Sequence, residues 1–174
     1  MAEPEYHVVM EDMDVPYNTR KGAILVPQAV YTVPHRLEAF EPPLPIRFGP
    51  DGVTVDRAHA GDLDELPDAD AGITDIEIGQ RIAIRINWPG YSGWCKHLTI
   101  PSSLGRCTKG RLAMEIARYI TLFLNDMRQA TPSEDTRRSG WEITNCGPED
   151  MVLLEIRKVS RGSWQPVLCR IIDR

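Results

Sequence analysis

The most regular hydrophobic pattern in the chain is an alternation of apolar and polar residues between positions 73 and 88. Its apolar members share one parity: Ile76, Ile78, Ile82, Ile84, Ile86 and Trp88. A period of two predicts a half-buried β-strand, or two strands joined near Gly79, with these side chains in the core. Pro89 and Gly90 then favour a tight turn, and residues 97–100 favour a returning strand.

A second pattern, with a helical period, occupies residues 109–129. Its apolar residues recur at spacings of three and four: Leu112, Ile116, Tyr119, Ile120, Phe123 and Met127. This single apolar stripe predicts an amphipathic helix over about 109–129. Thr108 is expected to cap its first turn, and Thr131-Pro132 to follow its end. Residues 131–140 then favour a linker.

The first 50 residues favour short strands only. Eight of the 14 prolines fall there, and proline suits neither the interior of a helix nor a central strand. We expect an interrupted edge strand at 23–33. We also expect an extended segment at 42–48 that leads into another short strand.

The end of the chain predicts a β-hairpin formed by residues 150–159 and 164–173. Pro166 indicates that the last strand lies at an edge or carries a bulge near its start. This order of elements favours an α+β fold, in which an antiparallel sheet of several short strands packs against one long helix.

The length favours one domain over 1–174, with residues 1–20 flexible and residues 57–75 forming an acidic loop. The net charge of −5 is unevenly distributed. Residues 1–76 carry 15 acidic and 5 basic residues, whereas residues 77–138 carry 5 acidic and 10 basic residues. This asymmetry predicts either pairing between the two regions or a basic face for an anionic partner.

The expected cellular compartment follows from two features that the sequence lacks, a membrane span and a secretory signal. No apolar run approaches the roughly 18 residues of a membrane span, and the first residues do not resemble a secretory signal. We therefore expect a cytoplasmic or nuclear protein with no membrane partner. The four cysteines form no CxxC pair and are expected to be free thiols in such a reducing compartment.

The sequence INWPGYSGWCKH, residues 86–97, gathers aromatic residues around the Pro-Gly turn. Trp88, Tyr91 and Trp94 would form a stacking platform for a base, a sugar or a proline-rich peptide if their faces were exposed. If buried, the same rings would anchor the turn to the sheet, and parity assigns Trp88 to the core. Residues 88–94 are called the aromatic turn below.

Three cations, Arg106, Lys109 and Arg111, lie at the start of the predicted helix, where the helix dipole disfavours positive charge. A bound anion would satisfy the free N–H groups and these cations together. Alternatively, the cations pair with carboxylates at residues 62–70 of the acidic loop. The pattern of a phosphate-binding loop is absent, so the sequence leaves both explanations open.

Candidate catalytic or metal-binding residues are few. Cys95 and His97 could ligate a metal with Cys107 and Cys146, but their spacing matches no standard zinc pattern. Cys95 could also form a thiolate–imidazole pair with His97 or His59. Other enzyme signatures, such as GxSxG, HExxH and GxGxxG, are absent. We therefore expect neither a cofactor nor a metal.

The runs IRINWPGYSGWCKHLTI and TKGRLAMEIARYITLFL together resemble a broad family of uncharacterised proteins encoded by mushroom-forming fungi. Those proteins carry a strand that ends in Trp-Pro-Gly-Tyr, a nearby tryptophan, and a helix that opens Thr-Arg-Ala-Lys-Leu. Here the helix opens at Thr108 with Thr-Lys-Gly-Arg-Leu. The resemblance covers about residues 76–127; it implies a shared fold and carries no activity.

Three functional hypotheses follow. The first is a non-enzymatic recognition module that contacts a protein or peptide through the aromatic turn and the basic helix start. The second is a binder of nucleic acid or another polyanion, which would use Arg106, Lys109 and Arg111. The acidic composition disfavours it, because such binders usually carry a basic domain. The third is a small enzyme with a pocket containing Cys95 and His97.

Overall fold

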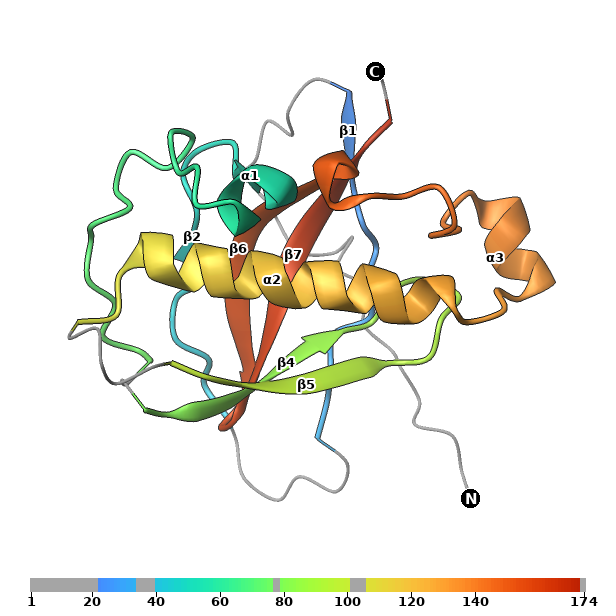
Figure 1. Cartoon of the computed structure of the whole chain (residues 1–174). Coiled ribbons are helices and arrows are strands. Elements are labelled where there is room, and N and C mark those ends of the chain that lie inside the picture. The colour runs from blue at the N-terminus through green and yellow to red at the C-terminus, as the bar shows by residue number, and fades with distance from the viewer. Residues whose placement is uncertain (1–21, 34–39, 77–78, 101–105, 173–174) are drawn as a thin grey trace.

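The computed structural model describes residues 22–33, 40–76, 79–100 and 106–172 (Figure 1). Residues 1–20, which we expected to be flexible, lie outside these ranges. The elements are β1 (Ala23–Leu25), β2 (Ile46–Arg47), β3 (Val53–Thr54), α1 (Val55–His59), β4 (Arg81–Ile86), β5 (Trp94–Thr99), α2 (Lys109–Arg128), α3 (Glu134–Ser139), a 3-10 turn (Pro148–Asp150), β6 (Met151–Ser160) and β7 (Ser163–Ile171).

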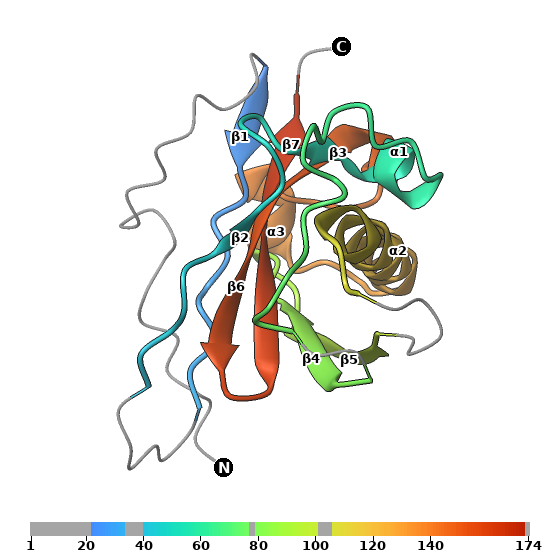
Figure 2. The same ribbon diagram turned by 90° about the vertical axis from the view of Figure 1, so that its left-hand side faces the viewer.

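All the strands belong to one sheet with the order β2-β6-β7-β4-β5; in addition, β1 pairs with β7 and β3 with β6. The β6–β7 hairpin lies at its centre, and α2 lies across one side of it (Figures 1 and 2). The α+β class, the long helix and the C-terminal hairpin are thereby confirmed. One pairing departs from the expected antiparallel sheet: β4 pairs with β7 in parallel.

The two predicted periodic patterns meet in the core between the sheet and α2. On β4, Ile82, Ile84 and Ile86 are fully buried, as the alternation predicts. The helical stripe packs opposite them, with the side chains of Leu112, Ile116, Ile120 and Phe123 equally buried. The Thr108 hydroxyl accepts a hydrogen bond from the Arg111 N–H at 3.3 Å, which confirms the expected N-cap.

Residues 26–33, which we call the strap, begin along the edge of β7 opposite β6. β4 pairs with another part of the same edge. The Val26 N–H donates to the Leu168 carbonyl at 2.9 Å. Beyond it, the buried Gln28 amide donates to the Pro166 carbonyl at 2.7 Å and accepts from the Asn87 N–H at 3.1 Å. A side-chain amide thus connects β7 with the residue that follows β4, beyond the point at which these two strands pair.

This bridge explains how β7, an interior strand, accommodates a proline. In an antiparallel strand the N–H and C=O of one residue point to the same side. Because the Pro166 carbonyl faces Gln28, its missing N–H faces the same gap, where no strand needs a donor. The predicted edge position is therefore wrong, although β6 does carry bulges, at Leu153/Glu155 and Lys158/Ser160.

Two expected loops are more ordered than the sequence suggested. The acidic loop starts inside α1, and its Leu66 is buried. The linker expected at 131–140 contains α3, whose N-cap Ser133 accepts from the Thr136 N–H at 3.2 Å. An N-cap serine, an acidic first turn and a terminal Gly140 are helix signals that the linker interpretation did not use.

Candidate functional site

The polar atoms of the aromatic turn bond to the chain itself. The Trp88 Nε1 donates to the Trp141 carbonyl at 2.7 Å. The Trp94 Nε1 donates to the Asp126 carboxylate at 2.9 Å, and this bond lowers the pKa of that carboxyl. The Tyr91 hydroxyl accepts from the Ile143 N–H at 3.1 Å. The turn therefore anchors the connection between α2 and β6.

The rings pack into the core. Trp88 is 1% exposed and Trp94 6% exposed. Trp94 meets Tyr119 and Phe123 edge-on, at ring-centroid distances of 6.4 Å and 5.7 Å. Tyr91 is half-buried against the same core. The faces of the two indoles are thus not available as a stacking platform.

The helix start is closed by the acidic loop. The N–H groups of Lys109 and Gly110 donate to the carbonyls of Ala71 and Ala69 at 2.9 Å and 2.8 Å. The Lys109 ammonium pairs with the Asp68 carboxylate at 2.5 Å. These groups, which would hold an anion, already have partners within the chain. Pairing with the acidic loop is the arrangement observed for Lys109.

The other two cations of the helix start are placed differently. Arg111 pairs with Glu115 at 3.3 Å, one turn along α2. Arg106 is exposed and packs over Gly72, where an added Cβ would lie 1.9 Å from the Arg106 Nε.

The structure does not bring the six predicted site residues together. Trp94 packs against Phe123 near the end of α2, whereas Lys109 begins the same helix. Fourteen residues of α-helix separate these two positions, which is about 20 Å. An aromatic ring and a helix-start cation therefore do not share one binding surface.

Three of the four thiols are buried: Cys107, Cys146 and Cys169. Burial raises the pKa of Cys107, and it raises the pKa of Cys146 and of Cys169 to about 11. Cys95 is exposed on β5.

Within the described ranges, no three His, Cys, Asp or Glu side chains gather to hold a metal ion. Over the same ranges, no helix has the length and apolarity to cross a bilayer.

We expect that one thiol of the folded chain reacts with iodoacetamide at neutral pH, and that it is Cys95. The thiolate is the reactive form, and a raised pKa keeps Cys146 and Cys169 protonated there, in addition to their burial. Intact-mass spectrometry would show one adduct on folded protein and four after unfolding in guanidinium. Rapid modification of a second thiol in the folded state would contradict this assignment.

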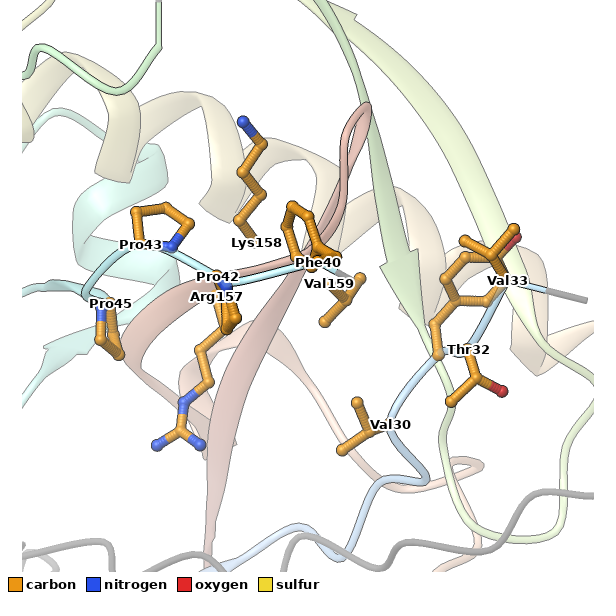
Figure 3. A pocket seen from close by; sticks show the side chains of 11 residues that line it. Val30, Thr32, Val33, Phe40, Pro42, Pro43, Pro45, Arg157, Lys158 and Val159 are labelled. Atoms are coloured by element: carbon orange, nitrogen blue, oxygen red, sulfur yellow. The ribbon is translucent and has the colours of Figure 1, made fainter. Parts of the chain in front are cut away.

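A groove opens beside the β6–β7 hairpin (Figure 3). The strap and the segment that leads into β2 lie on the side of this hairpin away from α2 (Figure 2). Its volume is about 460 Å³. The prolines of the segment 40–45 form one wall, and the end of the strap forms the opposite wall (Figure 3). The lining residues are Val30, Tyr31, Thr32, Val33, Phe40, Pro42, Pro43, Pro45, Arg157, Lys158 and Val159.

Buried polar side chains fix the strap wall. The Gln165 side chain accepts from the Tyr31 N–H at 3.0 Å and donates to the Ala29 carbonyl at 2.9 Å. The Arg85 guanidinium lies 3.7 Å from the centre of the Tyr31 ring and donates to the Ser163 hydroxyl at 3.0 Å. Gln165 of β7 thus holds the strap backbone, and Arg85 of β4 packs on the Tyr31 ring.

The floor of the groove at β6 contains a buried charge. Glu155 is fully buried, and its carboxylate pairs with Arg157, which lines the groove. Arg47 of β2 reaches the same carboxylate at 3.5 Å. This pair fixes the Arg157 side chain beneath the apolar walls.

The sequence did not predict this groove, although its proline-rich segment was visible. Proline lacks an N–H donor, so the prolines of residues 42–45 prevent this segment from extending β2 alongside β6. The edge of β6 is therefore left partly uncovered there.

Because comparison of this chain with protein-family models, curated proteins and solved structures finds no match, its resemblance to proteins of mushroom-forming fungi stays a prediction.

Proposed function

We propose that this protein is a non-enzymatic recognition module, and that its groove binds an extended segment of a partner polypeptide. The observation that carries the proposal is the apolar groove itself. Its walls consist of valine, proline and aromatic side chains, which suit the insertion of an aliphatic side chain. The surface used is therefore not the aromatic turn and helix start of the initial hypothesis.

The apolar surface continues beyond the groove, which favours a polypeptide over a small molecule. Leu44, between two groove prolines, is 85% exposed, and Val33 at the opposite wall is 37% exposed. Exposed apolar side chains beside a pocket are typical of protein interaction surfaces. A segment that inserts one side chain could cover both residues with its neighbours.

We expect that selection of a random peptide library on the full chain yields aliphatic peptides whose binding requires the groove. Replacing Val33 by aspartate should weaken a selected peptide more than about tenfold, because a carboxylate would be desolvated against an apolar ligand. The matched control is Ile24→Asp, since Ile24 of β1 is 40% exposed and does not line the groove.

Isothermal titration would give the affinities, and NMR chemical-shift mapping would locate the peptide. Shifts confined to the aromatic turn, or equal losses in Val33→Asp and Ile24→Asp, would argue against the groove. Failure to select any peptide would overturn the proposed function.

A further inference from the structure

We infer that residues 41–47 are themselves a ligand, bound by a partner domain whose groove is lined by aromatic side chains and bordered by a carboxylate. This inference goes beyond the proposed function, because here the chain supplies the bound segment and the partner supplies the groove. It derives from the conformation that the prolines impose on this segment and from the sides of the segment that face solvent.

Three prolines restrict the backbone of this segment, whose sequence is EPPLPIR. Each proline fixes its own φ at about −65°, and the residue before a proline is restricted to extended values of ψ. These restrictions favour the polyproline II helix, which has no internal hydrogen bonds. The structure accordingly has neither α-helix nor strand at residues 40–45, and the segment leads directly into β2. The segment is thus already in the conformation in which proline-rich ligands are bound.

One ridge of the segment faces solvent along its whole length. A polyproline II helix has three residues per turn, so Glu41 and Leu44 share one side of it, and Arg47 continues that side into β2. All three residues are exposed. Leu44 is 85% exposed, the highest value among the large apolar residues that the structure exposes. Half of the Arg47 side chain is exposed as well, although its Nε lies 3.5 Å from the Glu155 carboxylate.

A second side of the segment is partly accessible. Pro42 is exposed, and Pro45, three residues later, is half-buried. The third side faces the protein, since Pro43 is half-buried and Ile46 is buried. The chain therefore holds this helix by one side and presents the other two. A groove has two walls, so it can contact two of the three sides of such a helix.

The chemistry of the partner follows from the side chains on the accessible sides. Pro42 and Pro45 are the only two prolines in the chain that are three residues apart, and Arg47 follows the second by two. Segments of the pattern PxxP bind to SH3 and WW domains, whose grooves are lined by aromatic residues. The Leu44 side chain would pack against such rings. The Arg47 guanidinium would then meet a carboxylate at the border of the groove.

The test titrates the full chain into a panel of purified SH3 and WW domains by isothermal titration. We expect at least one domain to bind. Leu44→Asp should weaken that binding more than about tenfold, because a carboxylate would be desolvated against aromatic rings. Arg47→Gln should weaken it about threefold to fivefold, as expected for an ion pair at the border of an interface.

Two controls accompany these variants. Ile172→Asp places the same charge on another exposed apolar residue and should leave the affinity unchanged. Urea unfolding of Leu44→Asp should match that of the original chain, because the leucine is exposed. A loss of binding in Leu44→Asp then reports the lost contact and not a loss of folding.

The outcomes separate this inference from the proposed function, since the two surfaces share Leu44 but not Val33. If no domain of the panel binds, or if Leu44→Asp binds as tightly as the original chain, this inference is wrong and the groove proposal is unaffected. If Val33→Asp weakens binding and Leu44→Asp does not, the domain occupies the groove and the inference is again overturned. An unchanged affinity of Arg47→Gln would contradict the carboxylate border.

Discussion

Replacing Trp88 by alanine should lower the free energy of unfolding by about 3–5 kcal/mol. The side chain is 1% exposed and meets Trp141 edge-on, with ring centroids 5.8 Å apart. It also packs against Phe123 of α2, with a centroid distance of 5.9 Å. Alanine would leave a cavity where the aromatic turn, α2 and the connection to β6 meet.

Urea unfolding of Trp88→Ala and Trp88→Phe measures this effect. Phenylalanine retains a ring but removes the donor to the Trp141 carbonyl, so we expect an intermediate loss. Leu122→Ala is the control, because Leu122 is 38% exposed on α2 and should cost much less. A Trp88→Ala loss no larger than that of Leu122→Ala would mean that the indole is not an anchor.

Much of the fold could be predicted because periodicity reports burial directly. The alternation of isoleucines locates β4, and the helical stripe locates α2 to within one residue at its end. Both patterns result from one face of an element meeting a core. The alternation also places Trp88 in the core correctly, since the indole continues the parity of Ile84 and Ile86.

The aromatic turn shows where such local patterns stop being informative. Residues after a turn no longer continue the parity of the strand, so the sequence left Tyr91 and Trp94 open. Their burial depends on Asp126 and Ile143, which lie more than 30 residues away. The path of the chain between α2 and β6 decides whether these two rings are buried.

The groove could not be predicted either, because its walls and floor come from segments that are far apart in the sequence. Its walls come from the strap and the segment 40–45, and its floor comes from β6, more than 100 residues later. Gln28, which holds the strap, bonds to a carbonyl 138 residues away. A lone glutamine in a proline-rich segment gives no signal of such a role.

Charge behaves similarly. The sequence showed a basic middle region and an acidic first third, but not which cations find acids. In the structure Lys109 forms an ion pair with Asp68. No carboxylate among the described residues forms an ion pair with Arg81, Arg85 or Lys158. Two of the three cations at the helix start, Lys109 and Arg111, are thus compensated by acids of the chain, whereas Arg106 forms no ion pair with a described residue.

Replacing Arg157 by methionine should cost about 3 kcal/mol of folding stability. Methionine retains the apolar stem but leaves the fully buried Glu155 carboxylate without the guanidinium beside it. Arg47 remains within 3.5 Å of that carboxylate, but half of its side chain is exposed and its interaction is screened by solvent. We therefore expect a loss of folding stability at the lower end of the range for breaking a buried ion pair.

A double-mutant cycle separates the pair from the packing of its side chains. Glu155→Met/Arg157→Met removes both charges and should recover most of the loss, because no buried charge then remains uncompensated. Arg118→Met, which breaks the half-exposed pair with Glu115, should cost less than about 1 kcal/mol. If Arg157→Met costs no more than Arg118→Met in urea unfolding, the floor of the groove does not depend on this ion pair.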